Sequence, residues 1–525
     1  MKTYDPIELE IFKNVFVSIS EEMGAVLGRT ALSPNIKERK DYSCAVFNRR
    51  GETLAQGSHI PVHLGAMPLS VRAAVRALAF EPGDVVILND PYHGGTHLPD
   101  ITCIEPVFVG KKLSFFAANR AHHSDVGGMT PGSMPLATEI FQEGMILPPL
   151  KLIRRGSLDE DVLRLILANV RTPEERRGDL LAQLAACEKG RQRILESVEK
   201  FGLGKVLGYS SLIQDYTEKF LRKTLKDIPD GIYMFEDYLD DDGISDDPIR
   251  IRVAVRIRGD KAVVDFRGSS PQVKGGVNAN DAVTCSAVLY VFRSLIEEDI
   301  PFNTGLLRPI EIIAPPGLVV SARHPAATAA GNVETSQRIV DVLLGALAKA
   351  IPDRIPAASQ GTMNNIAIGG FDPAKGKAFA YYETIGGGMG AGREGEGLSG
   401  VHTHMTNSLN TPLEALEHYL PIRIRTYALR RGSAGSGRYS GGEGLVREYE
   451  FPVPAQVTIM SERRKFRPYG LRGGRPGAAG KNTLRRDGKD VVLKSKANLS
   501  IKSGDILRIE TPGGGGYGRP PKSKR

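Results

Sequence analysis

Two long helices with matching start signals stand among many short strand-like segments, and this alternation limits the fold class more than any other feature of the sequence. Asp5 and Thr172 are each followed directly by a proline and, two residues later, by a glutamate, which is the pattern of an N-cap, a first-turn proline and a capping box. Apolar residues then recur at three- and four-residue steps, in the first helix at Ile7, Ile11, Val15, Ile19, Met23 and Val26. The second helix is predicted to run towards Gly202.

Short apolar segments bounded by glycine and proline turns predict strands on both sides of the second helix. They include 43–47 and 84–88 before it, and 249–253 and 262–266 after it. Helical character is expected again at about 211–226, 282–297 and 336–350. The fold class is therefore predicted as α+β and multidomain, with strand-rich N- and C-terminal parts and a central long-helix segment.

The chain has 525 residues, more than one hydrophobic core usually serves, so several domains are expected. The predicted divisions are an N-terminal α+β domain at 1–155 that carries the candidate site, a helical arm at 156–227, a central α+β domain at 228–410, a strand-rich basic domain at 411–518 and a disordered tail at 519–525.

The four cysteines favour an intracellular protein. Cys44, Cys103, Cys187 and Cys285 are widely separated, without a C-x-x-C pair, which fits neither a disulfide framework nor a zinc knuckle. We expect them to be buried, reduced thiols. No signal sequence and no uninterrupted apolar run of about 18 residues is found, so a soluble, cytoplasmic protein without a membrane partner is expected.

Positive charge is concentrated near the C-terminus, where residues 421–525 carry 24 Lys and Arg against 8 Asp and Glu. Such a region could contact a phosphorylated substrate, an acidic partner subunit or nucleic acid, but a solvated strand-rich face explains it equally simply. Aromatic residues do not interleave with the basic ones, and tryptophan is absent from the chain. Nucleic-acid binding is therefore not expected.

Histidine and aspartate gather between residues 89 and 128, where four of the ten histidines of the chain occur. An H-x-x-D spacing appears twice, at His97/Asp100 and at His122/Asp125. Imidazole and carboxylate groups are the mixed nitrogen and oxygen ligands of catalytic zinc, manganese or iron, and three protein ligands leave a position open for water or substrate. The sequence therefore predicts a metal-assisted active site on loops at strand ends.

Several long motifs resemble the hydantoinase B family. They are Ser33-Pro34-Asn35-Ile36-Lys37-Glu38-Arg39, the segment from His59 to Pro68, the run from Asn89 to Asp100, the segment from Asn119 to Asp125, the segment from His402 to Asn407, and the closing Thr511-Pro512-Gly513-Gly514-Gly515-Gly516-Tyr517-Gly518. The motifs are spread over nearly the whole chain, and we identify it as a member of that family.

The resemblance implies that the chain is one of two components of an ATP-dependent enzyme. The family includes the B subunit of ATP-dependent N-methylhydantoinases, the C-terminal half of 5-oxoprolinases, and subunits of acetone and acetophenone carboxylases. A hydantoinase A-type partner of actin-like fold would use ATP to phosphorylate an amide or carbonyl oxygen. The implied function is hydrolysis of a cyclic amide within a hetero-oligomer; the alternatives are a subunit of a ketone carboxylase and a non-catalytic scaffold for the kinase subunit.

The resemblance also implies roles for individual residues. Matching the motifs of the carboxylases places a divalent metal on His97, Asp100 and His122, with His123 as the competing ligand. His63, His123 and Asp125 are expected to act in catalysis, and the predicted substrate-binding residues are His59, His402, His404 and Asn407. Alternation along an extended segment would put both His402 and His404 on one face.

Three acidic residues and several glycine motifs are weaker candidates. Glu139 and Glu143 have the spacing of one helical face and are expected to be solvated rather than to act as a general base, and Glu334 is a similar case. Gly390–Gly395 fits G-x-G-x-x-G, but no helix start follows it, and the glycine spacing before Lys481 is wrong for a phosphate loop. The sequence therefore predicts no nucleotide site of its own, and ATP would be bound by the partner.

Overall fold

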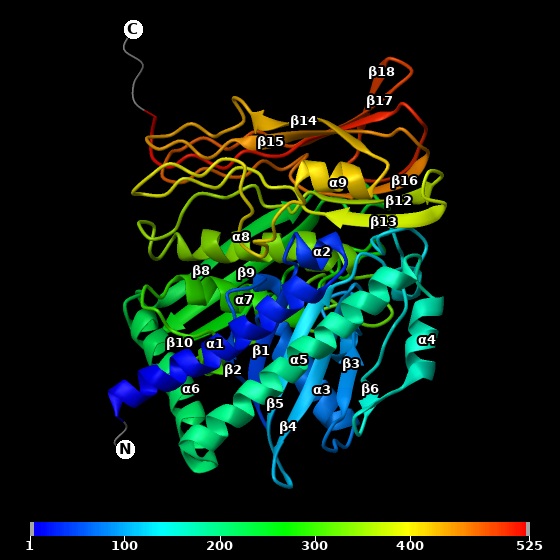
Figure 1. The fold of residues 1–525 in the computed structure, drawn as a ribbon. Coiled ribbons are helices and arrows are strands. Elements are labelled where there is room, and N and C mark those ends of the chain that lie inside the picture. Colours follow the sequence, from blue (N-terminus) through cyan, green and yellow to red (C-terminus); the bar gives the residue numbers. More distant parts are fainter. Residues whose placement is uncertain (1–4, 521–525) are drawn as a thin grey trace.

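The N-terminal part of the computed structural model, which describes residues 5–520, is built on one antiparallel sheet. Its strand order is β2-β1-β5-β4-β3-β6-β7. The strands are β1 (Tyr42–Asn48), β2 (Thr53–Gln56), β3 (Val85–Leu88), β4 (Asp100–Val109), β5 (Lys112–His122), β6 (Leu150–Arg154) and β7 (Ser157–Leu158). Helices α1 (Pro6–Thr30) and α5 (Pro173–Phe201) pack on one face of this sheet, and α3 (Ala66–Ala77) packs on the other (Figure 1).

Both predicted helix starts are confirmed in position, but they differ in how they are capped. The Asp5 carboxylate accepts a hydrogen bond from the backbone N–H of Ile7, whereas Thr172 makes no capping bond through its side chain. Helix α5 ends at Gly202, as predicted, where φ is +82°. The next helix, α6 (Leu203–Lys226), starts eight residues earlier than the predicted Ser211, because the chain enters it directly after this glycine.

The buried face of α1 differs from the predicted one. Ile7 and Ile11 are 72% and 43% exposed, and the core side instead carries Leu9, Phe12, Phe16 and Leu27 beside the predicted Ile19 and Met23. Phe12 stacks on Tyr209 of α6 with a ring separation of 4.6 Å. The helix has two apolar stripes, and the aromatic stripe faces the core because it buries more apolar area.

The central part pairs a four-stranded sheet with two buried helices. The strand order is β11-β10-β9-β8, with β8 (Gly231–Leu239), β9 (Ile249–Arg258), β10 (Lys261–Asp265) and β11 (Ile310–Ile313). Helices α7 (Asp281–Ser294) and α8 (Ser336–Leu347) share the largest core with this sheet. A short π-helix (Gly331–Thr335) leads directly into α8. The strands and helices predicted here are confirmed.

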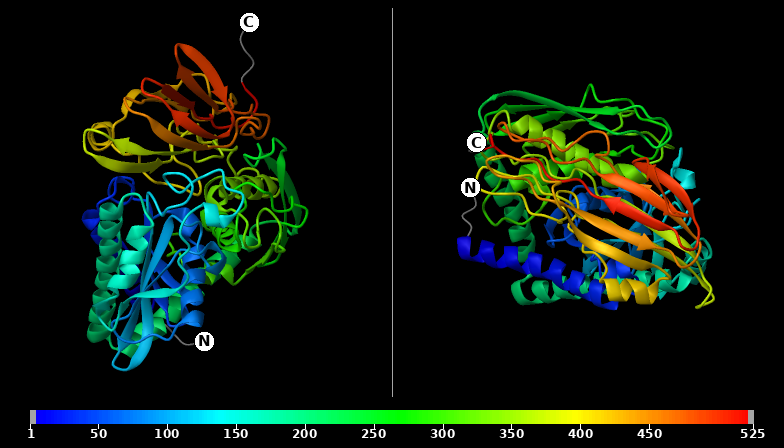
Figure 2. Two further views of the ribbon diagram at one scale, coloured as in Figure 1. Left: turned by 90° about the vertical axis from the view of Figure 1, so that its right-hand side faces the viewer. Right: turned by 90° about the horizontal axis from the view of Figure 1, so that it is seen from above.

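The C-terminal part is a sandwich of two sheets, seen at the top of Figure 1 and again in Figure 2. One sheet has the order β13-β12-β16-β19 and the other β14-β15-β20-β17-β18. Their strands are β12 (Asn365–Asp372), β13 (Lys377–Glu383), β14 (Arg423–Arg430), β15 (Gly444–Glu450), β16 (Ala455–Met460), β17 (Lys481–Arg486), β18 (Lys489–Leu493), β19 (Lys496–Ile501) and β20 (Ile506–Glu510). Apolar residues of both sheets form a common core.

The remaining elements are short helices and 3-10 turns. They are α2 (Pro34–Lys37), α4 (Glu160–Ala168), α9 (Leu413–Tyr419) and the 3-10 turns at Pro61–His63, Pro91–His93, Ile140–Gln142 and Thr304–Leu307. Glycine-rich loops from four parts of the sequence meet beside the sandwich. A Cβ atom on Gly442 would lie 1.8 Å from the carbonyl oxygen of Leu398, so only glycine fits there.

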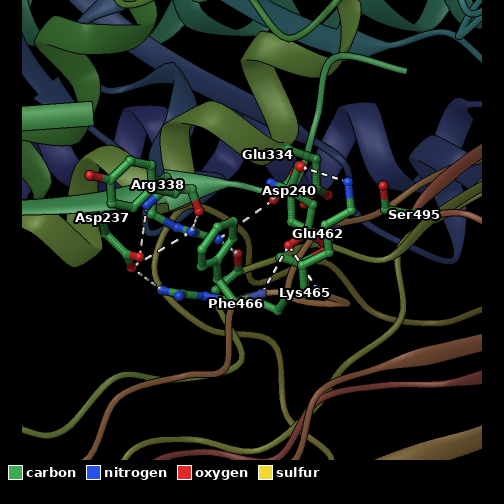
Figure 3. A network of polar contacts seen from close by, with 12 residues as sticks. Asp237, Asp240, Glu334, Arg338, Glu462, Lys465, Phe466 and Ser495 are labelled. Atoms are coloured by element: carbon green, nitrogen blue, oxygen red, sulfur yellow. Dashed lines mark hydrogen bonds and ion pairs between the residues drawn. The ribbon is translucent and has the colours of Figure 1, made fainter. Parts of the chain in front are cut away.

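A buried charged network joins the central sheet to the C-terminal sandwich (Figure 3). It consists of Asp237, Asp240 and Asp241 at the end of β8, Arg338 and Asp341 of α8, Glu462 and Arg463 after β16, and Lys496 of β19. The Asp240 carboxylate accepts hydrogen bonds from the backbone N–H groups of Arg464, Lys465 and Phe466. These contacts fix one part of the chain to the other.

The described residues show mixed helices and strands in four sheets, which confirms the α+β, multidomain prediction. The predicted domain boundaries stay predictions. Of the predicted tail, residues 521–525 lie outside the described residues. Between residues 5 and 520, none of the helices combines the length and the apolar character needed to cross a bilayer. Many C-terminal arginines face carboxylates of the same chain, such as Arg425 with Glu450 and Arg486 with Asp505.

Candidate metal centre

The predicted ligands His97, Asp100 and His122 come together where two neighbouring strands end. Asp100 is the first residue of β4, His122 is the last residue of β5, and the two are direct cross-strand partners. His97 lies in the loop before β4, and its backbone carbonyl accepts a hydrogen bond from the N–H of Asp100. The register of one hairpin therefore sets two of the three side chains, and a tight turn sets the third.

The geometry of the three side chains fits a metal ion. One ligand atom from each residue lies within 4.8 Å of the others, and all three side chains are buried. His97 Nδ1 lies 3.1 Å from Asp100 Oδ2, and His122 Nδ1 lies 3.5 Å from Asp100 Oδ1. Asp100 Oδ1 and both Nε2 atoms are buried without a hydrogen-bond partner. Buried polar atoms are rarely left without a hydrogen-bond partner, so these three unpaired atoms indicate that the site binds a metal ion or another small ligand.

Surrounding side chains hold the three residues in place. His63 bridges Ser43 Oγ, at 2.9 Å from Nδ1, and Asp100 Oδ2, at 3.2 Å from Nε2. The amide of Asn332, on the π-helix, lies 3.0 Å from His97 Nδ1. The His122 ring stacks on Tyr382 of β13 at 4.4 Å. Such contacts fix the tautomer and the orientation of a ligating imidazole.

The electrostatics keep the carboxylate of Asp100 charged. Burial alone would raise its pKa, but the neighbouring His97 and His63, the close approach of His122 and the hydrogen bond from His63 hold the pKa well below its usual value. Burial lowers the pKa of His122, more than Asp100 raises it. An ionised carboxylate beside a neutral imidazole is the protonation state that metal binding requires.

A small cavity of about 20 Å³ adjoins the cluster. Its polar side includes Asp41, His63, Asp100 and His122, and its apolar side is formed by Ile60, Val62, Val333, Met363 and Met405. This volume holds about one water molecule or ion. The cavity therefore presents a polar wall and an apolar wall to whatever enters it.

Asp41, Asn332 and Tyr382 contribute to the site but were not predicted from the sequence. Asp41 directly precedes β1, and its backbone carbonyl accepts a hydrogen bond from the N–H of His122. Arg39, two residues earlier, is fully buried and donates to Asn35, to Thr384 and to the carbonyl of Tyr382. Asp41 could have been found from the sequence, because it lies two residues after Arg39, which closes one of the motifs shared with the family. No signal in the sequence pointed to Tyr382.

His123 and Asp125 point away from the cluster. His123 Nε2 lies 2.9 Å from Gln183 of α5, and burial, followed by the charge of Arg176, lowers its pKa to about 4. The Asp125 carboxylate accepts hydrogen bonds from Arg171 and from the backbone of Gly127 and Gly132. Neither residue lines the cavity, so the structure gives no support to their predicted catalytic roles, and His122 rather than His123 belongs to the ligand group.

None of the predicted substrate-binding residues lines the cavity, although His404 and Asn407 flank its residues Met405 and Thr406 in the sequence. His59 Nδ1 accepts the backbone N–H of Cys44. Asn407 is exposed and donates to the carbonyl of His59. His402 and His404 do not share one face of an extended segment, because the chain turns at His404, where φ is +56°. Burial lowers the pKa of both, that of His402 to about 4 with Arg39 as a further cause.

The acidic candidates differ from expectation in two cases, Glu143 and Glu334. Glu139 is exposed, as predicted, but Glu143 is fully buried, since its carboxyl accepts the backbone N–H groups of Thr328 and Ala329. Burial raises its pKa to about 8. Glu334, on the π-helix beside Asn332, is also buried and accepts hydrogen bonds from Met363 and Asn365.

Comparisons with known proteins agree over almost the whole chain. Residues 5–520 match the family described as Hydantoinase B/oxoprolinase. An uncharacterised protein of Methanocaldococcus jannaschii is 43% identical, with 98% of this chain and 91% of that protein covered. The putative B subunit of a D-/L-hydantoinase from Pseudomonas sp. is 33% identical, with 99% and 91% covered. 5-Oxoprolinase 1 of Arabidopsis thaliana is 41% identical over 98% of this chain, which spans only 42% of that longer protein.

Solved structures show the same fold. The ATP-dependent caprolactamase from Pseudomonas jessenii superposes with a TM-score of 0.92 at 29% identity, covering 99% of this chain and 93% of that one. An acetone carboxylase chain in its nucleotide-free structure gives a TM-score of 0.91 at 19% identity, covering 98% and 76%, which shows the fold alone. The sequence match from end to end and the shared architecture lead to one conclusion: this chain belongs to the hydantoinase B/oxoprolinase family.

Proposed function

We propose that the chain is the B-type component of an ATP-dependent cyclic-amide hydrolase, and that His97, Asp100 and His122 form its catalytic metal centre. One observation carries the proposal. Two imidazoles and a carboxylate from separate segments converge in a buried position, with free ligand atoms, beside a cavity. The relatives named as a hydantoinase subunit and as 5-oxoprolinases, and the caprolactamase that shares the fold, are all associated with cyclic amides by name.

The three residues would hold a divalent cation such as zinc, manganese or iron, which would act as a Lewis acid or lower the pKa of a water. The side chains of this protein prepare the site for it. Asp100 stays ionised, and His63 fixes its position. Asp41 faces the same cavity with a carboxylate that can accept a proton. The apolar wall limits the access of bulk water.

A partner subunit would supply the activation. An amide is a poor electrophile, and phosphorylation of its oxygen opens its carbon to attack by water. The C–N bond of the adduct would then break as the nitrogen takes up a proton, and hydrolysis of the resulting acyl phosphate by a second water would release phosphate and leave the carboxylate. We propose that a hydantoinase A-type subunit of actin-like fold performs this ATP-dependent step within a hetero-oligomer. The Pseudomonas relative is named as one subunit of a hydantoinase, which supports this arrangement, as does the fact that this chain spans 42% of the Arabidopsis 5-oxoprolinase.

Two alternatives lead to different outcomes. In a ketone carboxylase, the same metal centre would join an activated ketone to a carboxyl group, and the fold shared with acetone carboxylase favours testing for this reaction. A scaffold would only support the partner subunit and would not need the metal centre. The convergent free ligand atoms favour a catalytic role over a scaffold.

The test is co-purification of the chain with an A-type partner, followed by metal analysis and by assays of ATP-dependent turnover on lactams, hydantoins and ketones. We expect His97→Ala and Asp100→Asn to reduce metal content and ring opening by at least about 100-fold, because even residues that only orient ligands are worth 10–100-fold. His93→Ala is the matched control, since His93 is 59% exposed and lies outside the cluster. Full ring-opening activity in both His97→Ala and Asp100→Asn would exclude the catalytic role and favour a scaffold. A carboxylated product formed from a ketone would identify the chain as a carboxylase subunit.

A further inference from the structure

The cavity beside the metal centre is too small for a cyclic amide. Its volume of about 20 Å³ accommodates one water or ion, whereas even a small lactam has a ring of several heavy atoms and a carbonyl oxygen besides. The structure therefore represents a closed state, provided that the proposed function is correct. One wall has to move before a substrate can reach Asp100.

Part of the cavity wall belongs to regular elements. Asp100 and His122 lie on β4 and β5, Tyr382 lies on β13, and Asn332 lies on the π-helix before α8. The irregular lining residues Asp41, Ile60, Met363 and Thr384 lie within two residues of such an element, whereas Met405 and Thr406 are several residues from the nearest helix or strand. We call residues 404–407 the lid segment.

Both ends of the lid segment are firmly attached. Before it, the backbone of Val401 exchanges two hydrogen bonds of 2.9 Å with Gly387, and Gln337 donates to the carbonyl of Thr403 at 2.9 Å. After it, the N–H of Leu409 donates to the carbonyl of Arg39, also at 2.9 Å. A short stretch is thus suspended between two fixed points.

The middle of the lid segment is held by weaker contacts. The N–H of Val62 reaches the carbonyl of Met405 at 3.3 Å, and the side chain of Asn407 reaches the carbonyl of His59 at 3.3 Å. The hydroxyl of Tyr290 lies 3.3 Å from His404 Nδ1. All three distances are at the long end of the hydrogen-bond range.

His404 combines two further signs of strain. Its φ of +56° is left-handed, a conformation that a residue with a Cβ adopts at a cost, and its buried Nε2 has no hydrogen-bond partner. Both costs are removed if the segment swings outward, since His404 can then relax its backbone and bind water. The polar contacts of the segment are therefore few, and burial of the Met405 side chain in the largest core is the main contribution that opposes opening.

We propose that residues 404–407 form a lid that opens to admit the substrate, with the Tyr290–His404 contact as its latch, and that Met405 limits the size of the ring that can bind. The proposal rests on the proposed function for the identity of the ligand. The opening itself is a property of the chain alone.

Opening is measured by thiol labelling of a Met405→Cys variant of the full chain. Met405 is fully buried, so the introduced thiol reacts only when the segment opens. Met460→Cys is the matched control, because Met460 is equally buried, on β16, which is part of a sheet. We expect the thiol at position 405 to react at least about tenfold faster than that at position 460. Labelling of the unsubstituted chain, which has four native cysteines, gives the baseline for both variants.

The latch is tested by adding Tyr290→Phe to both variants. Loss of the hydroxyl should speed labelling at position 405 about threefold or more and leave position 460 unchanged. Tyr233→Phe, which removes a hydroxyl bonded to the carbonyl of Pro229, should change neither rate. Equal labelling rates at positions 405 and 460, or no response to Tyr290→Phe, would overturn the lid.

Ring size is tested in the complex with the A-type partner. Met405→Ala should raise kcat/KM for a seven-membered lactam relative to a five-membered one by about tenfold, since a side chain is removed from the apolar wall. An unchanged ratio would refute the role of Met405. A complex without any lactam turnover but with fast labelling at position 405 would refute the proposed function and leave the lid intact.

Discussion

The histidine cluster and the charged network are both buried and both rich in ionisable groups, yet they are built in opposite ways. In the network, carboxylates face cations, as Glu462 faces Lys496 and Asp341 faces Arg463, and Asp240 is held by three backbone N–H groups. In the cluster, Asp100 faces imidazoles, and one atom of each of the three residues is buried without a hydrogen-bond partner. Pairing of opposite charges joins parts of a fold, whereas converging unpaired atoms of neutral imidazoles and a carboxylate leave capacity to bind a cation.

The largest effect should come from breaking the pairing in the network. Lys496→Met removes the buried cation nearest to Glu462 and leaves that carboxylate only Arg338 at 3.8 Å and Asp241 only Lys465 at 3.3 Å, which we expect to lower the free energy of unfolding by about 3–5 kcal/mol. Chemical denaturation measures this change. Lys494→Met, in which a 69% exposed lysine of a surface pair is lost, should leave the free energy of unfolding nearly unchanged. Equal effects of the two substitutions would contradict the distinction.

A smaller effect is expected when a side chain that orients the cluster is removed, rather than one of the three proposed metal ligands. Asn332→Ala takes away the amide beside His97 Nδ1, so the imidazole loses the contact that orients it. Metal affinity should fall by about 10–100-fold, as measured by competition with a chelator. Asn407→Ala serves as the control because its amide contacts only the carbonyl of His59. Unchanged affinity in Asn332→Ala would show that His97 needs no such partner.

A further effect depends on pH and concerns Glu143, a buried carboxyl that lies outside both the network and the cluster. Its pKa of about 8 lies above the 4.5 of an ordinary glutamate, so between these values the folded state keeps a proton that the unfolded state has lost. Its contribution to stability is therefore complete below about pH 4.5 and declines by up to about 1.4 kcal/mol per pH unit as the pH rises towards 8.

Glu143→Gln should flatten that part of the stability profile, and denaturation at several pH values between about 5 and 8 would show it. Glu139→Gln, at an exposed position four residues before it, should keep the slope of the wild type. A slope that is unaffected by Glu143→Gln would mean that the carboxyl is ionised in the folded protein.

The sequence allowed the secondary structure and the grouping of His97, Asp100 and His122 to be predicted. The helix starts at Pro6 and Pro173 follow from capping residues. The H-x-x-D spacing indicated a histidine and aspartate cluster, the family resemblance pointed to these three residues, and the structure brings their side chains together. The choice between His122 and His123 could not be made, because adjacent residues of a strand face opposite sides and the inner side depends on tertiary packing.

Long-range partners were beyond the sequence for the same reason. Tyr382 and Asn332 reach the site from more than 200 residues away, and no spacing rule connects them to His97 or His122. Glu143 was expected to be solvated because its neighbours suggested a helix surface; its two N–H donors come from residues 328 and 329. Ile7 and Ile11 were misplaced because periodicity alone does not tell which of two apolar stripes is buried.

The pairing of Asp100 with His122 has a consequence for how this protein can change in evolution or in engineering. Extra residues at the turn formed by Gly110 and Lys111, the far end of the β4–β5 hairpin, would leave the ligand pair untouched, so tags or loops are expected to be tolerated there. The hairpin already absorbs one unpaired residue in this way, at the register shift between Val107 and Phe108, while Asp100 and His122 stay paired. A change between that shift and the ligand pair would instead alter which side of the sheet a ligand faces, unless a second bulge absorbed it.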